Sequence, residues 1–427
     1  MSHGLPMLLQ IANPQLPPSG SGVFVIATLV KMVVVFTIYM IGVALLTLAE
    51  RKISAWIQDR HGPNRVGPWG LLQPAADGLK NFMKEETYPE AAYKPLFILA
   101  PILSFIPALT TWAVIPFGAP LPTRWGRVDM VLADLPVGFL FILAISSLGV
   151  YGIVLAGWAS NNKYALLGGL RSSAQMISYE ISLGMSTIPV LLLAGNVTLG
   201  SIVTQQAYGG WNVVNLTIAF LIFLVAAFAE TNRLPFDLPE AESELIAGYH
   251  TEYSAMKFSL FFIAEYANMV TASALMVTLF FGGWDVPFTG HDNIGPFSGW
   301  LTLLSVLIFL AKLLFFLFFF MWVRWTLPRF RYDQLMSLGW KFMLPLALAY
   351  IVVIAAVILV LDTAGITRGA MYSSVLGVVN IALVMIVFAI LDRGRIISPA
   401  YGRMDAVRLA RLRAVSSRSP LASGAGR

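Results

Sequence analysis

Six carboxylates cluster in one short segment that lies between two almost wholly apolar runs. The segment reads ETNRLPFDLPEAESELIAGYHTEY over residues 230–253 and contains one arginine, Arg233. Its acidic residues are Glu230, Asp237, Glu240, Glu242, Glu244 and Glu252. Carboxylates gathered beside a low-dielectric region share protons and titrate as a coupled set. The pattern favours proton handling; a solvated acidic loop is the alternative interpretation, and charge alone does not separate the two.

Three ionisable residues fall well inside apolar runs: Glu180, Glu265 and Lys312. Each costs about 3 kcal/mol to place at the centre of a membrane, so it is by default a functional candidate. Glu180 and Glu265 lie toward the cytoplasmic ends of their runs and could join the acidic segment in a chain of carboxylates. The alternative is a buried structural pair between either glutamate and Lys312. Lys31 could extend to the membrane surface and is assigned no role.

A second set of polar residues follows the first apolar run, in the sequence ERKISAWIQDRHGPNRVGPWG. Arginines alternate there with aromatic and amide side chains: Arg51, Trp56, Gln58, Arg60, Asn64, Arg65 and Trp69. A small-molecule site needs an apolar lining with a few convergent hydrogen-bonding groups. The set suits a polar cavity for a ring-shaped ligand with an apolar tail, although retention of the loop on one side of a membrane also explains arginines here.

The elements that must position these residues are membrane spans. Of the 427 residues, 58% are hydrophobic and only 12% are charged, whereas soluble domains are about 25% charged. A helix needs about 20 apolar residues to cross a bilayer, and nine runs meet that length. They lie near 22–48, 95–117, 136–158, 174–197, 212–230, 256–282, 299–323, 342–361 and 373–391. The first is longer than a signal-peptide core and is interpreted as a retained span.

The distribution of basic residues predicts the orientation. If the odd-numbered spans run inward, the inner loops and the C-terminal tail hold most of the 28 Lys and Arg, and the outer side holds Arg124, Arg127 and Arg368. Because cytoplasmic loops collect Lys and Arg, we expect the N-terminus outside and the C-terminus in the cytoplasm. The tail, residues 393–427, is expected to be partly disordered near anionic lipid, with no nucleic-acid partner.

Composition excludes several redox centres from this chain. It has no cysteine, so it can hold neither a thiolate-ligated iron–sulfur cluster nor a disulfide. Its histidines fall in the N-terminal segment or in loops, and no two of them lie in spans where they could sandwich a haem; they are His3, His61, His250 and His291. No metal site and no nucleotide-binding motif is visible. If the protein takes part in redox chemistry, another subunit must supply the electrons.

The first inner loop also predicts a helix. After Pro74, apolar residues such as Leu79 and Phe82 recur at helical spacing, opposite charged residues that include Asp77. This is the pattern of an amphipathic helix that lies on a membrane surface or against a partner. Since the inner loops are long and rich in Arg, Glu, Pro, Gly and aromatic residues, we expect the function on the cytoplasmic side.

Five motifs follow one another on the inner loops. They are ERKISAWIQDRHGPNRVG at 50–67, GLLQPAADGLKNFMKE at 70–85, LGGLRSSAQMISYE at 167–180, the acidic segment at 230–253, and RWTLPRFRYDQLMSLGW at 324–340. Together they resemble the H-subunit family of respiratory complex I, the quinone-site membrane component of NADH:quinone oxidoreductase. The resemblance covers about residues 24–361. His250 stands where the family commonly has Asn, and the ninth span and basic tail extend beyond the usual eight-span core.

The resemblance implies an all-α, polytopic membrane helical bundle of about nine transmembrane helices, with an amphipathic surface helix in the first inner loop. In this family the inner loops roof a tunnel for quinone, and carboxylates begin a proton route into the membrane. The residues that match the quinone-tunnel motifs are Arg51, Arg60, Asp77, Arg233 and Phe236. Those that match the acidic route are Glu180, Glu230, Glu240, Glu242, Glu244, Glu252 and Glu265.

The resemblance further implies a subunit that is not catalytic alone. Its expected partners are the other complex I subunits, quinone and the lipid bilayer, with FMN and iron–sulfur clusters held by partner subunits and no cofactor or metal of its own. The expected division is a membrane domain at 1–361, an extra span at 362–392 and a tail at 393–427, in a bacterial-type cell inner membrane. Either ubiquinone or menaquinone would suit. The alternatives are the equivalent subunit of a related membrane-bound hydrogenase or other quinone- or ferredoxin-linked dehydrogenase, and a free-standing proton or cation transporter.

Overall fold

The computed structural model describes residues 21–124, 126–237, 246–286, 298–366 and 369–392. The chain divides into two compact units, Met1–Gly377 and Val378–Arg427. Three of the predicted proton-route residues, Glu240, Glu242 and Glu244, lie outside the described residues, as does the C-terminal tail. The first unit contains both of the polar regions singled out above and every span except most of the last.

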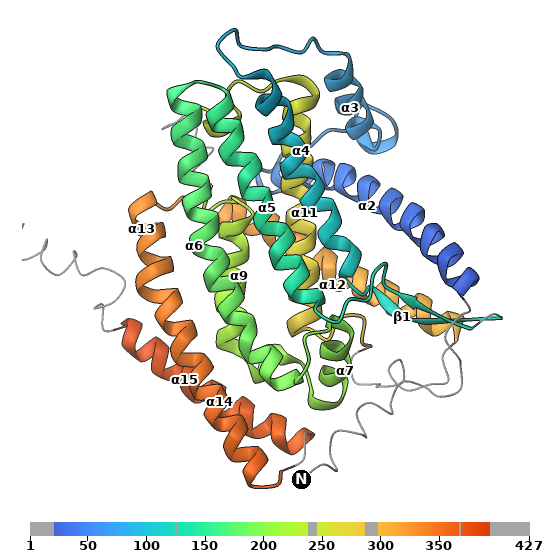
Figure 1. The fold of residues 1–427 in the computed structure, drawn as a ribbon, viewed down its shortest axis with the longest axis vertical. Helices are drawn as coiled ribbons and strands as arrows, with labels where there is room; N and C mark the ends of the chain where they lie inside the picture. Colours follow the sequence, from blue (N-terminus) through green and yellow to red (C-terminus); the bar gives the residue numbers. More distant parts are fainter. Residues whose placement is uncertain (1–20, 125, 238–245, 287–297, 367–368, 393–427) are drawn as a thin grey trace, which may run out of the picture. The chain divides into compact units, whose positions relative to one another are not determined.

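Helices dominate the described residues (Figure 1). In the part of the chain that the structure describes, eight helical segments are long and apolar enough to cross a membrane, and the predicted all-α membrane bundle is confirmed. The corresponding helices are α2 (Ser21–Ile57), α4 (Lys94–Thr110), α5 (Gly138–Ala159), α6 (Lys163–Ala194), α11 (Ala255–Phe280), α12 (Gly299–Thr326), α14 (Leu344–Thr363) and α15 (Ala370–Asp392). A ninth apolar helix, α9 (Thr217–Glu230), has 14 residues.

The expected fifth span near 212–230 is broken in the structure, and its helix α9 begins only at Thr217. Alone, α9 is about 21 Å long, less than the roughly 30 Å hydrocarbon core of a bilayer, so this run spans a bilayer only together with the residues before it. The run is interrupted at Leu216, whose φ of −137° and ψ of 48° are not helical. The four residues before it form the separate helix α8 (Asn212–Asn215). The Asn212 side chain donates a hydrogen bond to the carbonyl of Leu279 at 2.9 Å, so a polar contact fixes the interruption.

Two helices are longer than the apolar runs predicted. Helix α2 continues through Glu50 and Arg51 to Ile57, and α6 begins at Lys163 rather than near 174. Asn162 caps the start of α6, where its side-chain oxygen accepts a hydrogen bond from the backbone N–H of Tyr164 at 2.9 Å. Hydropathy locates only the part of a helix that can lie in lipid, so polar helical extensions escape it. One consequence is that Glu50 lies on a helix and not in a loop.

The remaining elements are short. They are the 3₁₀ turns η1 (Pro68–Gly70), η2 (Thr111–Val114) and η3 (Gly248–His250), the helices α3 (Gln73–Met83), α7 (Leu199–Gly209) and α13 (Tyr332–Ser337), the π-helical turn η4 (Leu338–Met343), and the strands β1 (Gly118–Thr123) and β2 (Gly126–Met130). Helix α3 is the predicted amphipathic helix, with Leu79 and Phe82 exposed.

The sequence did not predict the antiparallel hairpin of β1 and β2. Lys31, which was assigned no role, holds this hairpin. Its ammonium donates hydrogen bonds to the backbone carbonyls of Asp129 at 2.9 Å and Val131 at 2.7 Å.

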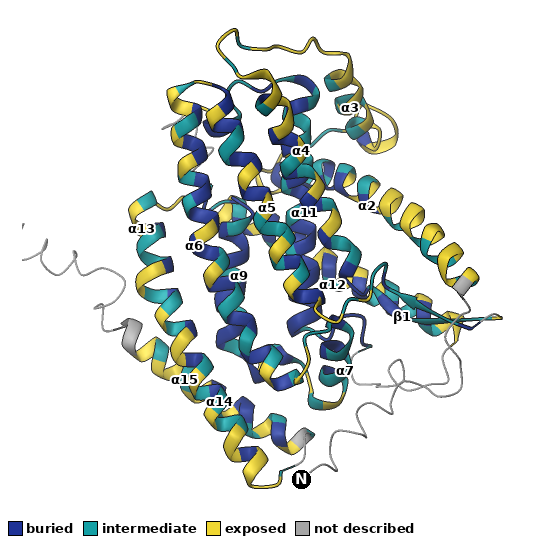
Figure 2. Ribbon diagram, in the orientation of Figure 1, coloured by how far each residue is buried: buried dark blue, intermediate teal, exposed yellow. Residues whose placement is uncertain are grey.

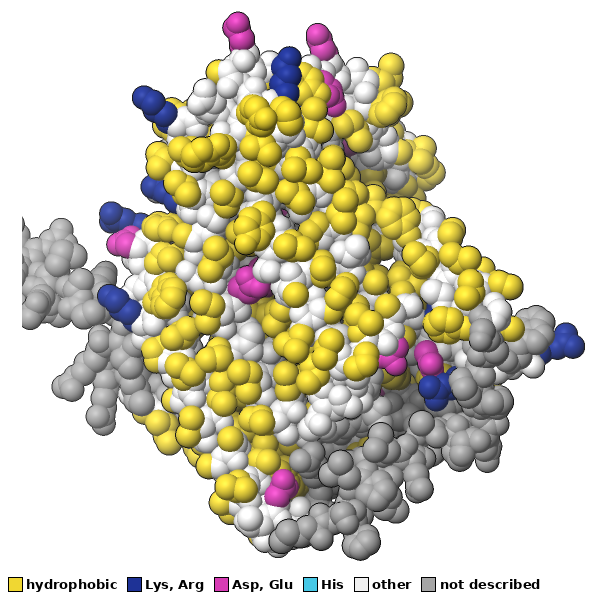
Figure 3. Space-filling model, in the orientation of Figure 1, with side chains coloured by type: hydrophobic (Ala, Val, Ile, Leu, Met, Phe, Trp, Pro, Cys, Tyr) yellow, Lys and Arg dark blue, Asp and Glu magenta, His cyan; other side chains and the backbone are white. Residues whose placement is uncertain are grey.

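Burial is greatest where α4, α5, α6, α9 and α11 pack together, and exposure is greatest along α2 and α3 (Figure 2). Small residues allow the close approach of these helices. A Cβ on Gly152 of α5 would lie 2.2 Å from the Ser104 hydroxyl of α4, and one on Gly157 would lie 2.6 Å from the carbonyl of Ala165 in α6. Most side chains on the face shown in Figure 3 are hydrophobic, which is the composition expected of a surface in lipid.

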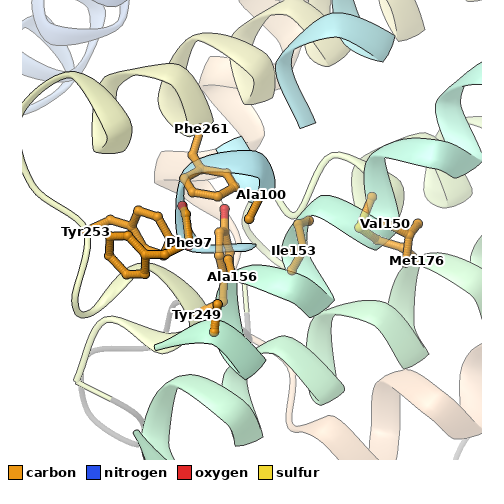
Figure 4. Close-up of a cluster of buried hydrophobic side chains, with 10 residues drawn as sticks. Phe97, Ala100, Val150, Ile153, Ala156, Met176, Tyr249, Tyr253 and Phe261 are labelled. Atoms are coloured by element: carbon orange, nitrogen blue, oxygen red, sulfur yellow. The ribbon is translucent and has the colours of Figure 1, made fainter. Parts of the chain in front are cut away.

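An aromatic cluster fixes the segment that follows the acidic residues (Figure 4). The rings of Tyr253 and Phe97 stack with centroids 4.0 Å apart, and the Tyr253 hydroxyl donates to the Phe97 carbonyl at 3.1 Å. Tyr249 packs edge-on against Phe261 of α11. The cluster therefore ties residues 246–254 to α4 and α11, so the chain enters α11 in a fixed orientation.

Candidate functional site

A buried ionic network lies where α2, α11 and α12 meet the segment after α9, with Glu50 at its centre. Glu50 is 6% exposed. Its carboxylate accepts hydrogen bonds from Arg233 at 3.1 and 3.2 Å, from Arg324 of α12 and from the hydroxyl of Tyr266 in α11. A buried carboxylate is tolerated only when it is paired and hydrogen-bonded, and three other segments of the chain supply the partners here.

Arg233 is the cation shared by two carboxylates. It is 3% exposed, its Nη1 lies 3.1 Å from Oε1 of Glu50, and its Nε lies 2.8 Å from Oε1 of Glu265. The guanidinium also lies over the Tyr266 ring, 4.3 Å from the centroid. Burial alone would lower the pKa of Arg233, but Glu265 and Glu50 together raise it above its usual value, so this arginine stays charged.

Asp237 and Phe236 extend the network toward the C-terminal end of α12. Asp237 lies 3.3 Å from Arg329. Burial raises the pKa of Asp237, and Arg329, Arg324 and Arg233 partly oppose that rise. The Phe236 ring stacks on Phe330 with centroids 5.5 Å apart. The segment thus contains a buried aromatic ring, and the carboxylate that follows it in sequence interacts with three arginines.

Gln175 of α6 holds this segment in place. Its side-chain amide donates to the carbonyls of Ala229 and Phe236, both at 2.8 Å, and to the side-chain oxygen of Asn232 at 3.2 Å. Asn232 in turn donates to the hydroxyl of Ser172, also on α6, at 3.2 Å. The position of Arg233 is therefore set by hydrogen bonds to α6 as well as by its own ion pairs.

A small cavity lies between Glu265 and a second predicted carboxylate, Glu230. It has a volume of about 30 Å³ and is lined by both Glu230 and Glu265, together with polar side chains that include Asn268. A polar cavity needs about 10–15 Å³ to hold a water molecule, so this one has room for water. Glu230 in turn has Ser146 as a hydrogen-bonding neighbour and lies close enough to Glu180 for their charges to interact. The structure thus brings together Glu180, Glu230 and Glu265.

The other predicted quinone residues lie apart from this network. Arg51 pairs with Asp77 at 2.7 Å, and their side chains are 48% and 25% exposed. Arg60 is exposed and donates to Gln58 at 2.7 Å. The tryptophans of this loop are also exposed, Trp69 at 81%. The predicted polar cavity is therefore not enclosed by this loop alone, and these side chains face outward at the end of the bundle that carries α3 (the α3 end).

Glu252 and His250 fix the loop that follows the acidic residues. Glu252 accepts a hydrogen bond from Asn162 at 2.7 Å, which ties it to the start of α6. The His250 ring lies between those of Tyr249 and Phe258. Burial lowers the pKa of His250 to about 4, so the imidazole is neutral at physiological pH.

Three members of the network were missed by sequence reasoning: Glu50, Tyr266 and Arg324. Glu50 is in one of the five motifs, but it follows the predicted end of the first span, so it was not counted among the buried ionisable residues. Arg324 begins another of the motifs but was given no role of its own. The available signal was an ionisable residue directly at the end of an apolar run, as in LTLAERK and WVRWTLP. The predicted alternative of a pair between Lys312 and Glu265 is not found, because Glu265 pairs with Arg233.

Comparison with known proteins identifies the family. The pattern that defines the family described as NADH dehydrogenase matches residues 30–355. The chain belongs to the NADH dehydrogenase family. Relatives within it include the H subunit (form 1) of the NADH-quinone oxidoreductase of Cytophaga hutchinsonii, which is 50% identical over 336 residues that cover 79% of this chain and 98% of the relative. The H subunit of the Leptospira biflexa NADH-quinone oxidoreductase is 51% identical over 338 residues, 77% of this chain and 93% of the relative.

A third member of the NADH dehydrogenase family is the H subunit (form 1) of the NADH-quinone oxidoreductase of Geobacter metallireducens. It is 54% identical over 326 residues that cover 76% of this chain and 94% of the relative. The resemblance seen in the five motifs is therefore confirmed. The family pattern contains every residue of the ionic network and of the carboxylate group. It ends at residue 355, so α15 lies beyond it.

Proposed function

We propose that this chain is the H subunit of a proton-translocating NADH-quinone oxidoreductase. In this role it binds quinone at the junction with a peripheral arm and begins the proton route into the membrane. The names of the relatives, the five motifs and the multi-pass bundle support this proposal over a component of a hydrogenase or a free-standing transporter. The chain lies in a cell inner membrane with its N-terminus outside and its C-terminus in the cytoplasm, while partner subunits hold FMN and the iron–sulfur clusters.

The quinone-binding part of the proposal uses two groups of residues. Arg51 and Arg60 lie exposed and Asp77 half-buried at the α3 end, where a partner subunit can complete the wall of a tunnel. Arg233 and Phe236 are buried and offer a cation and an aromatic ring from one short segment. An apolar lining with few convergent polar groups is what a quinone headgroup and its apolar tail require.

The proton-route part rests on one observation: Glu265 belongs both to the ionic network and to the lining of the small cavity. Its carboxylate lies 2.8 Å from Arg233, which also binds Glu50, and it lines the same cavity as Glu230. Unit charges 4 Å apart interact by about 4 kcal/mol at an effective dielectric constant of 20. A change in charge at Glu50 therefore changes how strongly Arg233 holds Glu265. Glu265 can then exchange a proton with Glu230 through water in the cavity, and Glu230 can exchange one with the neighbouring Glu180. The loop residues Glu240, Glu242, Glu244 and Glu252 supply protons from the cytoplasmic side.

The test is Glu180→Gln in the assembled complex. Gln keeps the shape and hydrogen-bonding capacity of the side chain but removes the titratable group. Quinone-linked turnover and proton pumping should fall together, while NADH oxidation by an artificial acceptor stays at the wild-type level. Glu180→Asp, which keeps the acid on a shorter stem, should retain more of both activities. The measurement is the number of protons taken up per NADH in sealed vesicles.

Glu90→Gln is the matched control, because Glu90 is an exposed carboxylate on the first long loop. It should leave turnover and the proton ratio unchanged. Full turnover with an unchanged proton ratio in Glu180→Gln would reduce Glu180 to a structural residue and contradict the proposed route.

A further inference from the structure

The loop between α3 and α4 is fastened to the start of α11 by a buried lysine. Lys257 lies in the first turn of α11, and its side chain is 8% exposed. Its ammonium donates a hydrogen bond to Oε2 of Glu86, on the loop, at 2.7 Å. The ammonium also lies 3.6 Å from the ring centroid of Tyr88 and 5.8 Å from that of Phe97, within the range of cation–π contacts. Membrane topology explains a lysine near the cytoplasmic end of a span, but it does not explain why this lysine is buried beside two rings.

The loop meets the start of α11 at a second place. Ser254 directly precedes α11, and its hydroxyl oxygen lies 2.7 Å from that of Thr87 and accepts a hydrogen bond from the backbone N–H of Thr87 at 3.3 Å. The Tyr88 hydroxyl donates to Glu86 at 2.9 Å. Donation from Lys257 and Tyr88 holds the pKa of Glu86 below its ordinary value, so this carboxylate is ionised at neutral pH. We call these five residues, Glu86, Thr87, Tyr88, Ser254 and Lys257, the α11 clasp.

The α11 clasp matters because burial does not hold α3 in place. The structure describes all the residues of α3, and none of them is buried. Leu79 and Phe82 are 58% and 74% exposed. A long loop joins α3 to α4 (Figure 1). Because a helix that buries little apolar surface gains little from packing, the position of α3 depends on polar contacts and on the chain at its ends.

The α11 clasp shortens the free chain at the end of α3. Three residues lead from Met83, the last residue of α3, to Glu86, and they reach at most about 10 Å. Without the clasp, eleven residues would separate Met83 from the start of α4 at Lys94, a reach of up to about 37 Å. Nearer its start, α3 is tied to α2 by the pair of Asp77 with Arg51 at 2.7 Å. The pair and the clasp together therefore hold α3 at two separate places.

We propose that Lys257 is a positioning residue for quinone. Through the α11 clasp it fixes the end of α3, and with it the part of the quinone entry that α3 and Asp77 contribute. This inference rests on the proposed quinone-binding role of the α3 end. Ordering a loose segment when a ligand binds costs affinity, so a fixed α3 lets quinone enter a preformed site. Because the clasp does not touch the reacting groups, its loss should raise the KM for quinone and leave kcat unchanged.

The first test opens the clasp in the assembled complex. Lys257→Met keeps the apolar stem and removes the ammonium, whereas Glu86→Ala removes the carboxylate. Each should raise the KM for a decyl-tailed benzoquinone about fivefold, the size expected when binding must also order a few side chains. The kcat and NADH oxidation by an artificial acceptor should stay at the wild-type level. In the double variant the KM should rise no further than in the more affected single variant, because both changes open the same contact.

A covalent tether separates the position of α3 from the charge of Lys257. This chain has no cysteine of its own, and the hydroxyl oxygens of Thr87 and Ser254 lie 2.7 Å apart, so Thr87→Cys and Ser254→Cys can form a disulfide that replaces the clasp. In the Lys257→Met background, oxidised glutathione should bring the KM back to within about twofold of wild type, because a disulfide removes the ordering cost. Dithiothreitol should raise the KM again.

Hydrogen exchange measures the loosening of the loop without quinone. Exchange of residues 84–92 in the assembled complex should be faster in Lys257→Met and should return to the wild-type rate when the tether closes. Lys163→Met and Glu90→Gln are the matched controls, because Lys163 is an exposed lysine in the first turn of α6 and Glu90 is an exposed carboxylate on the same loop. Both controls should leave exchange and KM unchanged. If Lys257→Met prevents assembly, Glu86→Ala with the same tether carries the test, since the Glu86 side chain is 39% exposed.

Three outcomes overturn the inference. Unchanged exchange in the clasp variants would show that the clasp does not hold the loop. Faster exchange with an unchanged KM would show that the position of α3 does not set quinone entry, and so would a raised KM that the closed tether does not restore. The KM of Asp77→Asn then separates this inference from the proposed function. A raised KM in Asp77→Asn keeps the quinone site and removes only the role of the clasp, whereas an unchanged KM removes both.

Discussion

Two sets of arginine–carboxylate pairs differ mainly in their access to solvent. In the buried network, Arg233 is 3% exposed and shares its charge between Glu50 and Glu265 at distances of about 3 Å. In the loop pair, Arg51 and Asp77 are equally close, at 2.7 Å, but the side chains are 48% and 25% exposed. Judged by distance alone, the two sets of ion pairs would be expected to be equally strong.

Their energetics separate them. Removal of one member of a buried pair leaves an uncompensated charge in low dielectric and costs about 3–5 kcal/mol. An exposed pair contributes about 0–1 kcal/mol, because water screens it and the side chains lose entropy when they pair. The buried network is therefore part of what holds α2, α11 and α12 together. The loop pair contributes little to the fold and leaves its charges available to a partner subunit or a ligand.

The largest expected effect is that of Arg233→Met. The substitution keeps the apolar stem but leaves Glu265 without its cation, and Glu50 with Arg324 as its remaining arginine. A loss of about 3–5 kcal/mol is expected, which should lower the yield of assembled complex in the membrane, measured on native gels. Adding Glu265→Gln should recover part of the yield, because it removes the stranded carboxylate.

Arg329→Met is the matched control for this comparison. Arg329 also pairs with a carboxylate, Asp237, but its side chain is 35% exposed, so its loss should cost much less. If both substitutions lower the yield equally, or if Glu265→Gln recovers nothing, then burial does not distinguish the two sets of pairs.

A middle-sized, pH-dependent effect is expected at His250. Its folded pKa is about 4, whereas an unfolded chain has a His pKa of about 6.5. Between these two pH values the unfolded loop binds more protons than the folded loop. The stability that the neutral His250 gives to the folded loop is therefore fully present above about pH 6.5 and is lost as the pH falls toward about 4. At about 1.4 kcal/mol per pH unit, roughly 2 kcal/mol is lost between pH 6.5 and 5.

The measurement is the proteolytic cleavage rate in residues 246–254, taken as the ratio of wild type to His250→Asn, since this ratio cancels the protease's own pH dependence. The ratio should rise as the pH falls. The exposed His61 offers the control variant His61→Asn, which should change nothing. A ratio that stays constant between pH 7.5 and 5 would show that the His250 ring is not held neutral by the fold.

The bundle could be predicted from hydropathy, because lipid selects long apolar runs whatever their tertiary partners are. The ends of the helices could not be predicted from hydropathy, because polar residues such as Glu50 and Arg51 can continue a helix beyond its apolar part. The hairpin of β1 and β2 was missed for a related reason. Its polar contacts come from distant residues, such as Lys31 to Asp129, and leave no local pattern in the sequence.

The site was predicted in part. Arg233 and Glu265 were singled out because a lone arginine among carboxylates and an acid within an apolar run are visible locally. Their partner Glu50 was not, since it meets Arg233 and Arg324 across 183 and 274 residues of sequence. Which charges pair depends on how α2, α11 and α12 cross, and a single sequence does not encode that in any short pattern.

The smallest effect on stability, and the sharpest test of the comparison, is expected for the loop pair. A double-mutant cycle of Arg51→Ala and Asp77→Asn should give a coupling energy below about 1 kcal/mol in thermal unfolding of the purified complex. If these residues bind quinone, each single variant should nevertheless raise the KM for quinone, while NADH oxidation by an artificial acceptor is unchanged. Lys80→Ala, which removes the exposed cation 3.8 Å from Asp77, serves as control.

A coupling energy as large as that of the buried network would mean that a partner subunit buries the loop pair in the complex. An unchanged KM would remove Arg51 and Asp77 from the proposed tunnel.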